Sequence, residues 1–362
     1  MYLKRQIEER LKGAIAQDSA VLITAPKRAG KSFLLQQVLT GYNHVSLSDL
    51  FARHLAESDP LLFFKTYQPP LVIEDIHYVP ALMKHLEGKY ILTGSQTKEV
   101  LGMKGSIIHL ELYPLSWKEI LTVDPYDQIQ CAQQMIKGFY PELHLCHASY
   151  LSMYLEREIQ AMRSVHDLRK FQQYLVALAT HVGKILNQSE IAKKCNISQT
   201  TATDWLRLLE MSSIIYLHHP YTKNLQKRVI KAPKLFFVDT GLLCYLLYIR
   251  TPEQLVHSPF AEQIFKNMVI MEKVKEFAHQ GCSGLIHYYK TNNGLEIDLL
   301  IDWGNFFNIY NIKYSRAPAA QSIHSLAYFK NKYTVKKAVL LNLHKEPVSL
   351  SNGISAEHWF DH

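Results

Sequence analysis

The first third of the chain alternates short apolar runs with polar turns and longer amphipathic stretches. The apolar runs have the length of strands that are buried on both faces of a sheet. They span residues 21–24, 71–75, 90–95 and 107–112. Such strands, separated by helical stretches, predict an α/β fold with a doubly wound parallel sheet, in which a ligand binds at the carboxyl ends of the strands.

A loop after the first apolar run has the composition of a phosphate-binding loop. The sequence A-P-K-R-A-G-K-S occupies residues 25–32 and precedes the apolar residues 33–35. Strand, loop and helix in this order are the context that a P-loop requires. Main-chain N–H groups of such a loop, and the N-terminus of the helix that follows, bind phosphate oxygens.

Two side chains of this loop have separate expected roles. Lys31 would reach the β- and γ-phosphates of ATP, and Ser32 would hold magnesium through its hydroxyl. The first glycine of the usual pattern is Ala25 here, and Pro26 favours an extended backbone at Ala25 that alanine tolerates. A lysine-rich turn without a ligand is the alternative. The residues predicted to bind the nucleotide are Ala25, Pro26, Lys27, Arg28, Ala29, Gly30, Lys31, Ser32 and Phe33.

Polar side chains end two further apolar runs of this segment. Residues 71–75 end in the carboxylates of Glu74 and Asp75, as a Walker B element does. Residues 90–95 include the hydroxyls of Thr93 and Ser95, which could contact the γ-phosphate or the attacking water. Because carboxyl ends of parallel strands share one edge of the sheet, these groups are expected beside the loop.

Several motifs resemble AAA-type ATP-binding proteins of bacteria and archaea that carry a C-terminal restriction-nuclease-like domain of unknown function. The first three are L-V-I-E-D-I-H-Y-V-P, I-L-T-G-S and L-E-L-Y-P-L-S-W-K-E-I. The resemblance continues through G-F-Y-P, Y-L-E-R-E-I, K-A-P-K-L-F-F-V-D-T-G-L-L and G-L-E-I-D-L-L-I, over residues 20–345. It implies a P-loop domain, a helical region and a nuclease-like domain in one chain.

Two departures from that family bear on hydrolysis. The family usually ends its Walker B strand Asp-Glu, so the resemblance implies that Glu74 binds magnesium and Asp75 polarises water. A catalytic base displaced by about 1 Å can lose on the order of 100-fold in rate. Ser106 stands where the family often has an arginine. We therefore expect a weak or slow magnesium-dependent ATPase that acts as a nucleotide-controlled switch. The alternative is a nucleotide-gated binding or scaffold protein without significant hydrolysis.

The middle of the chain has the pattern of a winged helix-turn-helix. A helix is predicted at 169–180, two shorter helices at 189–195 and 199–210 around the turn 196–198, and a wing strand at 214–218. The second short helix is the place for DNA recognition. The residues predicted to contact DNA are Gln199, Thr200, Thr203 and Arg207 on that helix, and Lys227 and Arg228 in the basic stretch 221–234. A packing module that passes conformational change between neighbours is the alternative.

The last part has the element order of a restriction-endonuclease-like core. A helix is predicted at 260–278, strands at 285–289, 295–301, 306–313 and 338–343, and a helix at 319–330. Strand alternation places Glu296 and Asp298 on one face as candidate metal ligands.

The candidate metal site is altered in two places relative to the nuclease pattern. Asn311 replaces the glutamate expected two residues before Lys313. Lys266 replaces a glutamate of the preceding helix in relatives. We expect a degenerate domain, with metal-dependent cleavage only if Glu272 joins Glu296 and Asp298 in a metal site.

Length and composition limit these expectations. The 362 residues predict a P-loop ATP-binding domain at 1–125, a helical linker with the winged helix at 126–220 and the nuclease-like domain at 221–362. The net charge of +8 favours an anionic partner such as duplex DNA. Five scattered cysteines are typical of reduced thiols, and the longest apolar run, 242–249, is shorter than the roughly 18 residues of a membrane span. We expect a cytoplasmic protein without a membrane partner.

Overall fold

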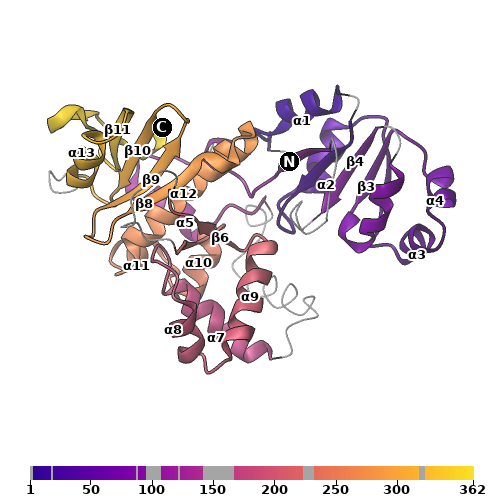
Figure 1. Ribbon diagram of the computed structural model, residues 1–362, viewed down its shortest axis with the longest axis horizontal. Coiled ribbons are helices and arrows are strands. Elements are labelled where there is room, and N and C mark those ends of the chain that lie inside the picture. The colour runs from indigo at the N-terminus through magenta and orange to yellow at the C-terminus, as the bar shows by residue number, and fades with distance from the viewer. Residues whose placement is uncertain are drawn as a thin grey trace.

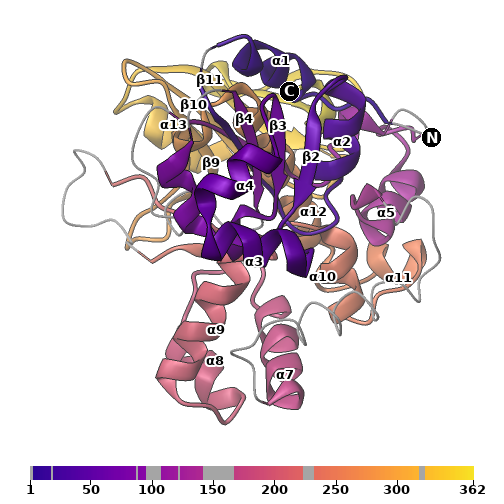
Figure 2. The ribbon, with the colours of Figure 1, turned by 90° about the vertical axis from the view of Figure 1, so that its right-hand side faces the viewer.

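The computed structural model describes residues 3–17, 19–86, 89–94, 107–120, 123–141, 167–222, 232–317 and 323–362. An N-terminal sheet and a C-terminal sheet lie side by side, and the helices α7, α8 and α9 project away from both (Figure 1). The same helices extend from the molecule in the perpendicular view (Figure 2). None of the helices in the described ranges is long and apolar enough to cross a bilayer.

The N-terminal sheet is parallel, as the apolar runs predict. Its order is β2-β3-β4-β1-β5, so β4 lies between β3 and β1. The strands are β1 Val21–Thr24, β2 Asn43–Ser46, β3 Leu71–Glu74, β4 Tyr90–Gly94 and β5 Ile108–Glu111. The helices are α1 Glu8–Ile15, α2 Lys31–Val38, α3 Leu50–Ser58 and α4 Pro60–Thr66, with 3₁₀ turns η1 Ile76–Tyr78, η2 Pro80–His85 and η3 Trp117–Glu119. Two separate apolar clusters pack on this sheet.

The middle segment contains the predicted helix-turn-helix. Ser198 caps the second helix of the motif by accepting a hydrogen bond from the main-chain N–H of Thr201 at 3.0 Å. The helices are α5 Gln128–Lys137, α7 Leu168–Ala179, α8 Gln188–Lys194, α9 Gln199–Met211, α10 Thr240–Leu246 and α11 Pro252–Val256. The predicted wing strand β6, Ile215–His218, pairs antiparallel with β7, Lys234–Phe237. This pairing spans the division expected between residues 220 and 221.

The C-terminal sheet is mixed and follows a long helix. Its order is β12-β13-β11-β10-β9-β8, with β9 antiparallel to both of its neighbours, β8 and β10, and with β11 parallel to β10. The elements are α12 Ala261–Gln280, η5 Ser283–Leu285, β8 Ile286–Lys290, β9 Glu296–Asp302, β10 Phe307–Ile312, α13 His324–Lys330, β11 Val335–Asn342, β12 Val348–Ser349, η7 Ser351–Gly353, β13 Ser355–His358 and η8 Trp359–Asp361. The largest apolar cluster joins this sheet through α12 to the middle helices, so the two regions share a core.

The D-T-G-L-L block fixes α10 against the end of α5. Asp239 caps α10 by accepting from the N–H of Leu242 at 2.9 Å, and also accepts from the N–H of Phe139 at 2.6 Å. A Cβ on Gly241 would lie 2.7 Å from the Cα of Gly138. A Cβ on Gly138, whose φ is 82°, would lie 2.7 Å from Asp239 Oδ1. Glycine is therefore required at both positions where the two segments touch.

Candidate functional site

The loop between β1 and α2 has the curled backbone of an anion-binding loop. Arg28 and Gly30 have φ values of 63° and 93°, in the left-handed region. Gly30 is the N-cap of α2, and no side chain in the described ranges caps this helix. A loop that alternates backbone hand in this way turns successive N–H groups inward, and the helix N-terminus adds partial positive charge. The backbone at residues 28–30 therefore suits the binding of an anion.

Lys31 folds back over this loop. Its Nζ donates to the main-chain oxygen of Ala25 at 3.1 Å and to that of Pro26 at 3.2 Å. The ammonium group therefore lies against the mouth of the loop, at the end of β1. A long flexible side chain that donates to loop carbonyls can exchange these hydrogen bonds for a phosphate without disturbing the fold.

Ser32 and Glu74 meet at the carboxyl edge of the sheet. The Ser32 hydroxyl, at the start of α2, donates a hydrogen bond to the Glu74 carboxylate at the end of β3. His44 Nδ1 lies 3.9 Å from the same carboxylate. A hydroxyl beside a carboxylate is a donor set that suits magnesium, which prefers oxygen ligands. The residues predicted to hold the metal are thus together.

Asp75 has a strained backbone that is supported by Thr93. Its φ is 59°, and its N–H donates to Thr93 Oγ1 at 3.3 Å across the β3–β4 pair. Thr93 is fully buried. Its hydroxyl accepts the hydrogen bond from Asp75 and was expected to contact the γ-phosphate or the attacking water. His77 Nδ1 lies 4.0 Å from Asp75 Oδ1. Burial lowers the pKa of His77; the Asp75 charge opposes this shift and Lys31 reinforces it. Ser95 lies outside the described residues.

Arg5 contacts the loop from the N-terminal segment, and the sequence pattern did not indicate it. Its Nη1 donates to the main-chain oxygen of Ala29 at 2.9 Å, and its Nη2 donates to that of Tyr113. Its Nε lies 3.2 Å from Glu119, with both side chains nearly inaccessible to solvent. The S-x-x-E signature of a capping box could have indicated Glu119, since Ser116 and Glu119 form that motif.

The segment after β5 is bonded to α12 as well as to Arg5. The N–H of Trp117 donates to Glu272 Oε2 at 2.7 Å, and Lys275 Nζ donates to the main-chain oxygen of Leu115 at 2.8 Å. Lys275 is 1% exposed. A continuous set of polar contacts therefore runs from the phosphate-binding loop to the long helix of the C-terminal part.

A cavity of about 350 Å³ lies between the start of the loop and the middle segment. Ala25 and Pro26 line one side, and Ser213 and His219, which flank β6, line another. A molecule bound at the loop would therefore lie close to the winged-helix region.

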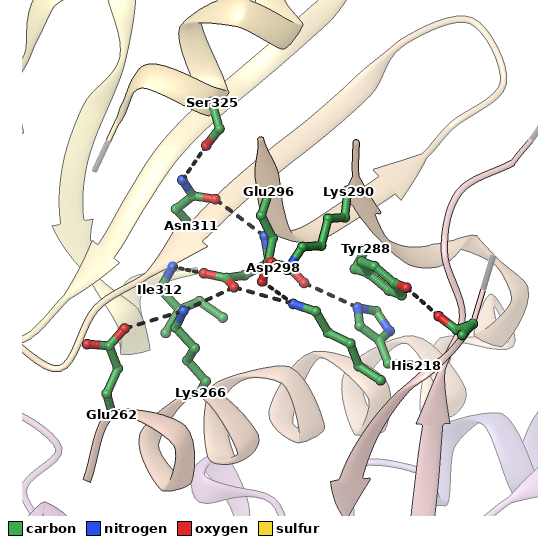
Figure 3. Close-up of polar contacts among 12 residues, drawn as sticks. His218, Glu262, Lys266, Tyr288, Lys290, Glu296, Asp298, Asn311, Ile312 and Ser325 are labelled. Carbon is green, nitrogen blue, oxygen red and sulfur yellow. Dashed lines mark hydrogen bonds and ion pairs between the residues drawn. The ribbon is translucent and has the colours of Figure 1, made fainter. Parts of the chain in front are cut away.

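Asp298 is the centre of a second cluster of charged side chains (Figure 3). Its Oδ1 accepts from Lys266 Nζ at 3.1 Å, and Lys234 Nζ lies 3.9 Å from the same oxygen. Its Oδ2 accepts from the N–H of Ile312 at 2.9 Å. Burial alone raises the pKa of Asp298, but Lys266 and Lys234 leave it below its ordinary value.

Glu296 lies two residues before Asp298 on β9 and is also paired with lysines. It accepts a hydrogen bond from Lys234, and its Oε2 lies 2.5 Å from Lys290 Nζ. Burial acts to raise the pKa of Glu296, and the two lysines outweigh that effect and lower it. Lys234 thus joins β7 of the middle segment to β9 of the C-terminal sheet.

Glu262 supplies a third carboxylate from the first turn of α12. Its Oε1 accepts from Lys313 Nζ at 2.9 Å and lies 3.4 Å from Lys266 Nζ. Burial lowers the pKa of Lys266, but Asp298 and Glu262 raise it above the ordinary value. Lys266 is therefore charged at neutral pH, between two carboxylates.

These residues do not fit a divalent metal. Asn311 uses its amide within the protein: its Oδ1 accepts from the N–H of Asp298 at 3.3 Å and its Nδ2 donates to Ser325 at 2.9 Å. The expected metal-ligand role of Asp298 and Glu296 is not supported, because lysine ammonium groups neutralise both carboxylates. Glu272 does not join them, since it bonds to Trp117. Within the described ranges, no group of three His, Cys, Asp or Glu residues is arranged to hold a metal.

The predicted recognition helix α9 has an accessible polar face. Its side chains Gln199, Thr200, Thr203 and Arg207 are exposed, as DNA contact would require. Lys227 and Arg228 of the basic stretch lie outside the described residues.

Three family models match successive parts of the chain. Residues 17–121 match an AAA domain. Residues 129–253 match a domain of unknown function, DUF8612, and residues 261–359 match another, DUF4143. The AAA match and the loop geometry together support an AAA-type, nucleotide-binding domain.

Similar proteins extend this comparison without adding an activity. An uncharacterized protein of Mycobacterium tuberculosis is 22% identical over 339 residues, which cover 87% of this chain and 75% of that protein. An uncharacterized protein of Mycobacterium bovis matches to the same extent.

Two solved structures give weak overall superpositions. One is a signal transduction ATPase with numerous domains and a tetratricopeptide repeat sensor from Pyrococcus horikoshii (TM-score 0.23, 12% identity, 78% of this chain and 48% of that chain). This chain thus spans about half the length of that ATPase. The other is AMPPCP-bound DnaA from Aquifex aeolicus (TM-score 0.28, 14% identity, 56% of this chain and 85% of that chain). Scores this low define no common arrangement of whole chains.

Proposed function

We propose that this chain binds ATP with magnesium at the P-loop and hydrolyses it slowly, so that the bound nucleotide acts as a switch. The observation that carries the proposal is the convergence of Lys31, Ser32 and Glu74 at the carboxyl edge of the parallel sheet. An ammonium group beside main-chain amides suits a polyphosphate, and a hydroxyl paired with a carboxylate suits the magnesium that accompanies it.

Each of these residues has a role that its position supports. Lys31 would exchange the loop carbonyls for the β- and γ-phosphates. Ser32 and Glu74 would hold magnesium, which supplies positive charge next to the phosphate oxygens. Asp75 would accept a hydrogen bond from the attacking water, and Thr93 would fix Asp75 through its N–H.

Slow turnover follows from the length and attachment of Asp75. Aspartate is one methylene shorter than the glutamate that relatives place at this position, which withdraws the carboxylate by about 1 Å. A displacement of about 1 Å can cost on the order of 100-fold in rate. The left-handed backbone of Asp75 and its bond to Thr93 limit any compensating shift.

The contacts of Arg5 support a switch. Arg5 touches Ala29 in the loop and Glu119 in the segment that α12 also holds. A change in the loop on nucleotide binding would alter the bond to Ala29 and so the balance of contacts on that segment. The cavity beside Ala25 places the winged-helix region within reach of the same change.

Duplex DNA is the macromolecular partner that we propose for α9. Its exposed Gln199, Thr200 and Thr203 can contact base edges, and Arg207 can contact a phosphate. Asp204 is exposed on the same helix and opposes a strong phosphate attraction. We therefore expect weak, salt-sensitive binding.

A nucleotide-gated scaffold without significant hydrolysis is the second candidate, and the position of the wing favours it. The N–H of Tyr221 donates to the oxygen of Tyr288 at 2.7 Å, and the N–H of Tyr288 donates to the oxygen of His219 at 3.1 Å. The end of β6 is thus hydrogen-bonded to β8, which suits a module that packs between neighbours.

Calorimetric titration of the intact protein with magnesium-ATP tests the shared part of both proposals. Saturable binding that Lys31→Ala weakens strongly is expected; absence of binding to the unmodified chain contradicts the site. Steady-state phosphate release with and without duplex DNA at low salt then separates the two. Measurable turnover that Asp75→Asn abolishes supports the switch ATPase, and binding without turnover supports the scaffold.

A further inference from the structure

The cluster around Asp298 contains a positive charge at the position where a bridging cation would lie. Lys266 Nζ is 3.1 Å from Asp298 Oδ1 and 3.4 Å from Glu262 Oε1, so one ammonium group contacts carboxylates of β9 and α12. The Lys266 side chain is 14% exposed and that of Asp298 is 8% exposed. An ammonium ion in this place neutralises the same carboxylates that a metal would.

The position of Lys266 is fixed by the neighbouring residue on α12. Asn267 is fully buried, accepts from the N–H of Phe237 at 2.7 Å and donates to its main-chain oxygen at 2.7 Å. These two bonds set the rotation of α12 against β7. With α12 in this rotation, the side chain of Lys266 extends toward β9 and reaches Asp298.

The charge balance of the cluster opposes a divalent ion. Four ammonium groups face three carboxylates: Lys234, Lys266, Lys290 and Lys313 against Glu262, Glu296 and Asp298. The difference is +1 before any metal is added. Lys234, Lys266 and Asp298 are the most buried of these groups, at 3%, 14% and 8% side-chain exposure. Two ammonium groups already face one carboxylate there, so a divalent ion at Asp298 would have to displace Lys266.

We propose that Lys266 is the resident cation of this carboxylate site, and that the site is a divalent-cation site in latent form. Lys266→Glu would present three carboxylates, with Glu262 one helical turn before it and Asp298 across from it. A glutamate side chain is shorter than a lysine, which leaves room for an ion with metal–oxygen distances of about 2.1 Å. We expect the unmodified chain to take up no divalent ion at these carboxylates.

Manganese binding to the intact protein, followed by electron paramagnetic resonance of free Mn²⁺, tests this proposal. All variants carry Ser32→Ala, which removes one ligand of the magnesium site that we propose at the P-loop. We expect Lys266→Glu to add one Mn²⁺ per chain with an affinity at least about tenfold above that of the parent. Glu262→Gln in the same chain should reverse the gain. Lys12→Glu, the same charge change at an exposed position of α1, should add none.

Two results would overturn the proposal. One is Mn²⁺ binding by the Ser32→Ala parent that Glu262→Gln abolishes, because the ammonium group would then not exclude the metal. The other is a Lys266→Glu variant that is folded by circular dichroism and gains no Mn²⁺. If Lys266→Glu fails to fold, Mn²⁺ binding by the Ser32→Ala parent, with and without Glu262→Gln, still tests whether the ammonium group excludes the metal.

Discussion

The guanidinium of Arg5 donates a hydrogen bond to the main-chain oxygen of Ala29, at 2.9 Å, inside the phosphate-binding loop. Arg5→Ala removes this support and leaves the buried Glu119 without its ion-pair partner. We expect a loss of about 3–5 kcal/mol in stability, as for a broken buried pair, and nucleotide affinity about tenfold weaker. Thermal unfolding and fluorescent-nucleotide titration measure the two effects.

Arg10→Ala is the matched control for this prediction. Arg10 also lies in the N-terminal segment, but its Nη1 donates to the main-chain oxygen of Ala278 on α12, at 2.8 Å. Its replacement should leave nucleotide affinity unchanged. Equal losses of affinity in both variants would show that Arg5 acts only through general stability.

The order of the two carboxylates after β3 sets the hydrolysis rate in our proposal. The double change Glu74→Asp with Asp75→Glu restores the usual order and brings the second carboxylate about 1 Å further out. Turnover should rise by roughly 10- to 100-fold with little change in nucleotide affinity. Phosphate release under single-turnover conditions measures it, with Lys31→Ala as the inactive reference. An unchanged rate would mean that the position of Asp75 is not limiting.

Gly241 and Gly138 are in backbone contact, so a methyl group at residue 241 has no space. Gly241→Ala should destabilise the protein by about 1–3 kcal/mol or more, as overpacking does. Gly284→Ala is the comparison, because a Cβ there meets nothing within 4 Å, and a change within about 0.5 kcal/mol is expected. Chemical denaturation of both variants measures the two changes in the free energy of unfolding. A Gly241→Ala protein as stable as Gly284→Ala would contradict the contact.

Three buried histidines make the protein sensitive to mild acid. Burial lowers the pKa of His218 to about 3, and those of His279 and His358 to about 4. Since the unfolded chain takes up these protons near pH 6.5, stability is complete above that pH and falls below it. Each histidine contributes up to about 1.4 kcal/mol per pH unit. Unfolding midpoints at pH 7.5 and 5.5 measure the loss.

His279→Leu should reduce this acid sensitivity by the share of one histidine. Neither ring nitrogen of His279 has a hydrogen-bond partner in the described part of the chain, so replacement by leucine removes no hydrogen bond there. The exposed His324→Gln should leave the dependence unchanged. If both variants keep the full loss between pH 7.5 and 5.5, His279 is not one of the groups responsible.

Local pattern predicted the P-loop well because its elements are contiguous in sequence. The run at 21–24, the loop and α2 follow one another, and apolar runs of this length form buried strands wherever a sheet covers them. β2, β12 and β13 were not predicted because each is short and partly polar, so pairing rather than composition makes them strands. β7 lies within the K-A-P-K-L-F-F-V-D-T-G-L-L motif, but the sequence pattern did not predict its pairing with β6.

Contacts between distant residues could not be predicted in the same way. Arg5 lies 24 residues from Ala29 and 108 from Tyr113, and an arginine in a charged amphipathic segment usually faces solvent. Lys266 was recognised as a departure from relatives, but its bond to Asp298 depends on the rotation of α12. Neither the contacts of Arg5 nor the bond of Lys266 to Asp298 leaves a periodic pattern in the sequence, so they become visible only in the folded structure.

Leu115 and Trp117 obtain hydrogen-bond partners from α12, which begins more than 140 residues later in the chain. A fragment that stops near residue 125 would leave the oxygen of Leu115 and the N–H of Trp117 without these partners and would uncover the Trp117 ring. We therefore expect the N-terminal part to be destabilised when it is separated from α12. A chimera that takes this part from a relative must also take that relative's residues at positions 272 and 275, because these side chains form the hydrogen bonds to Trp117 and Leu115.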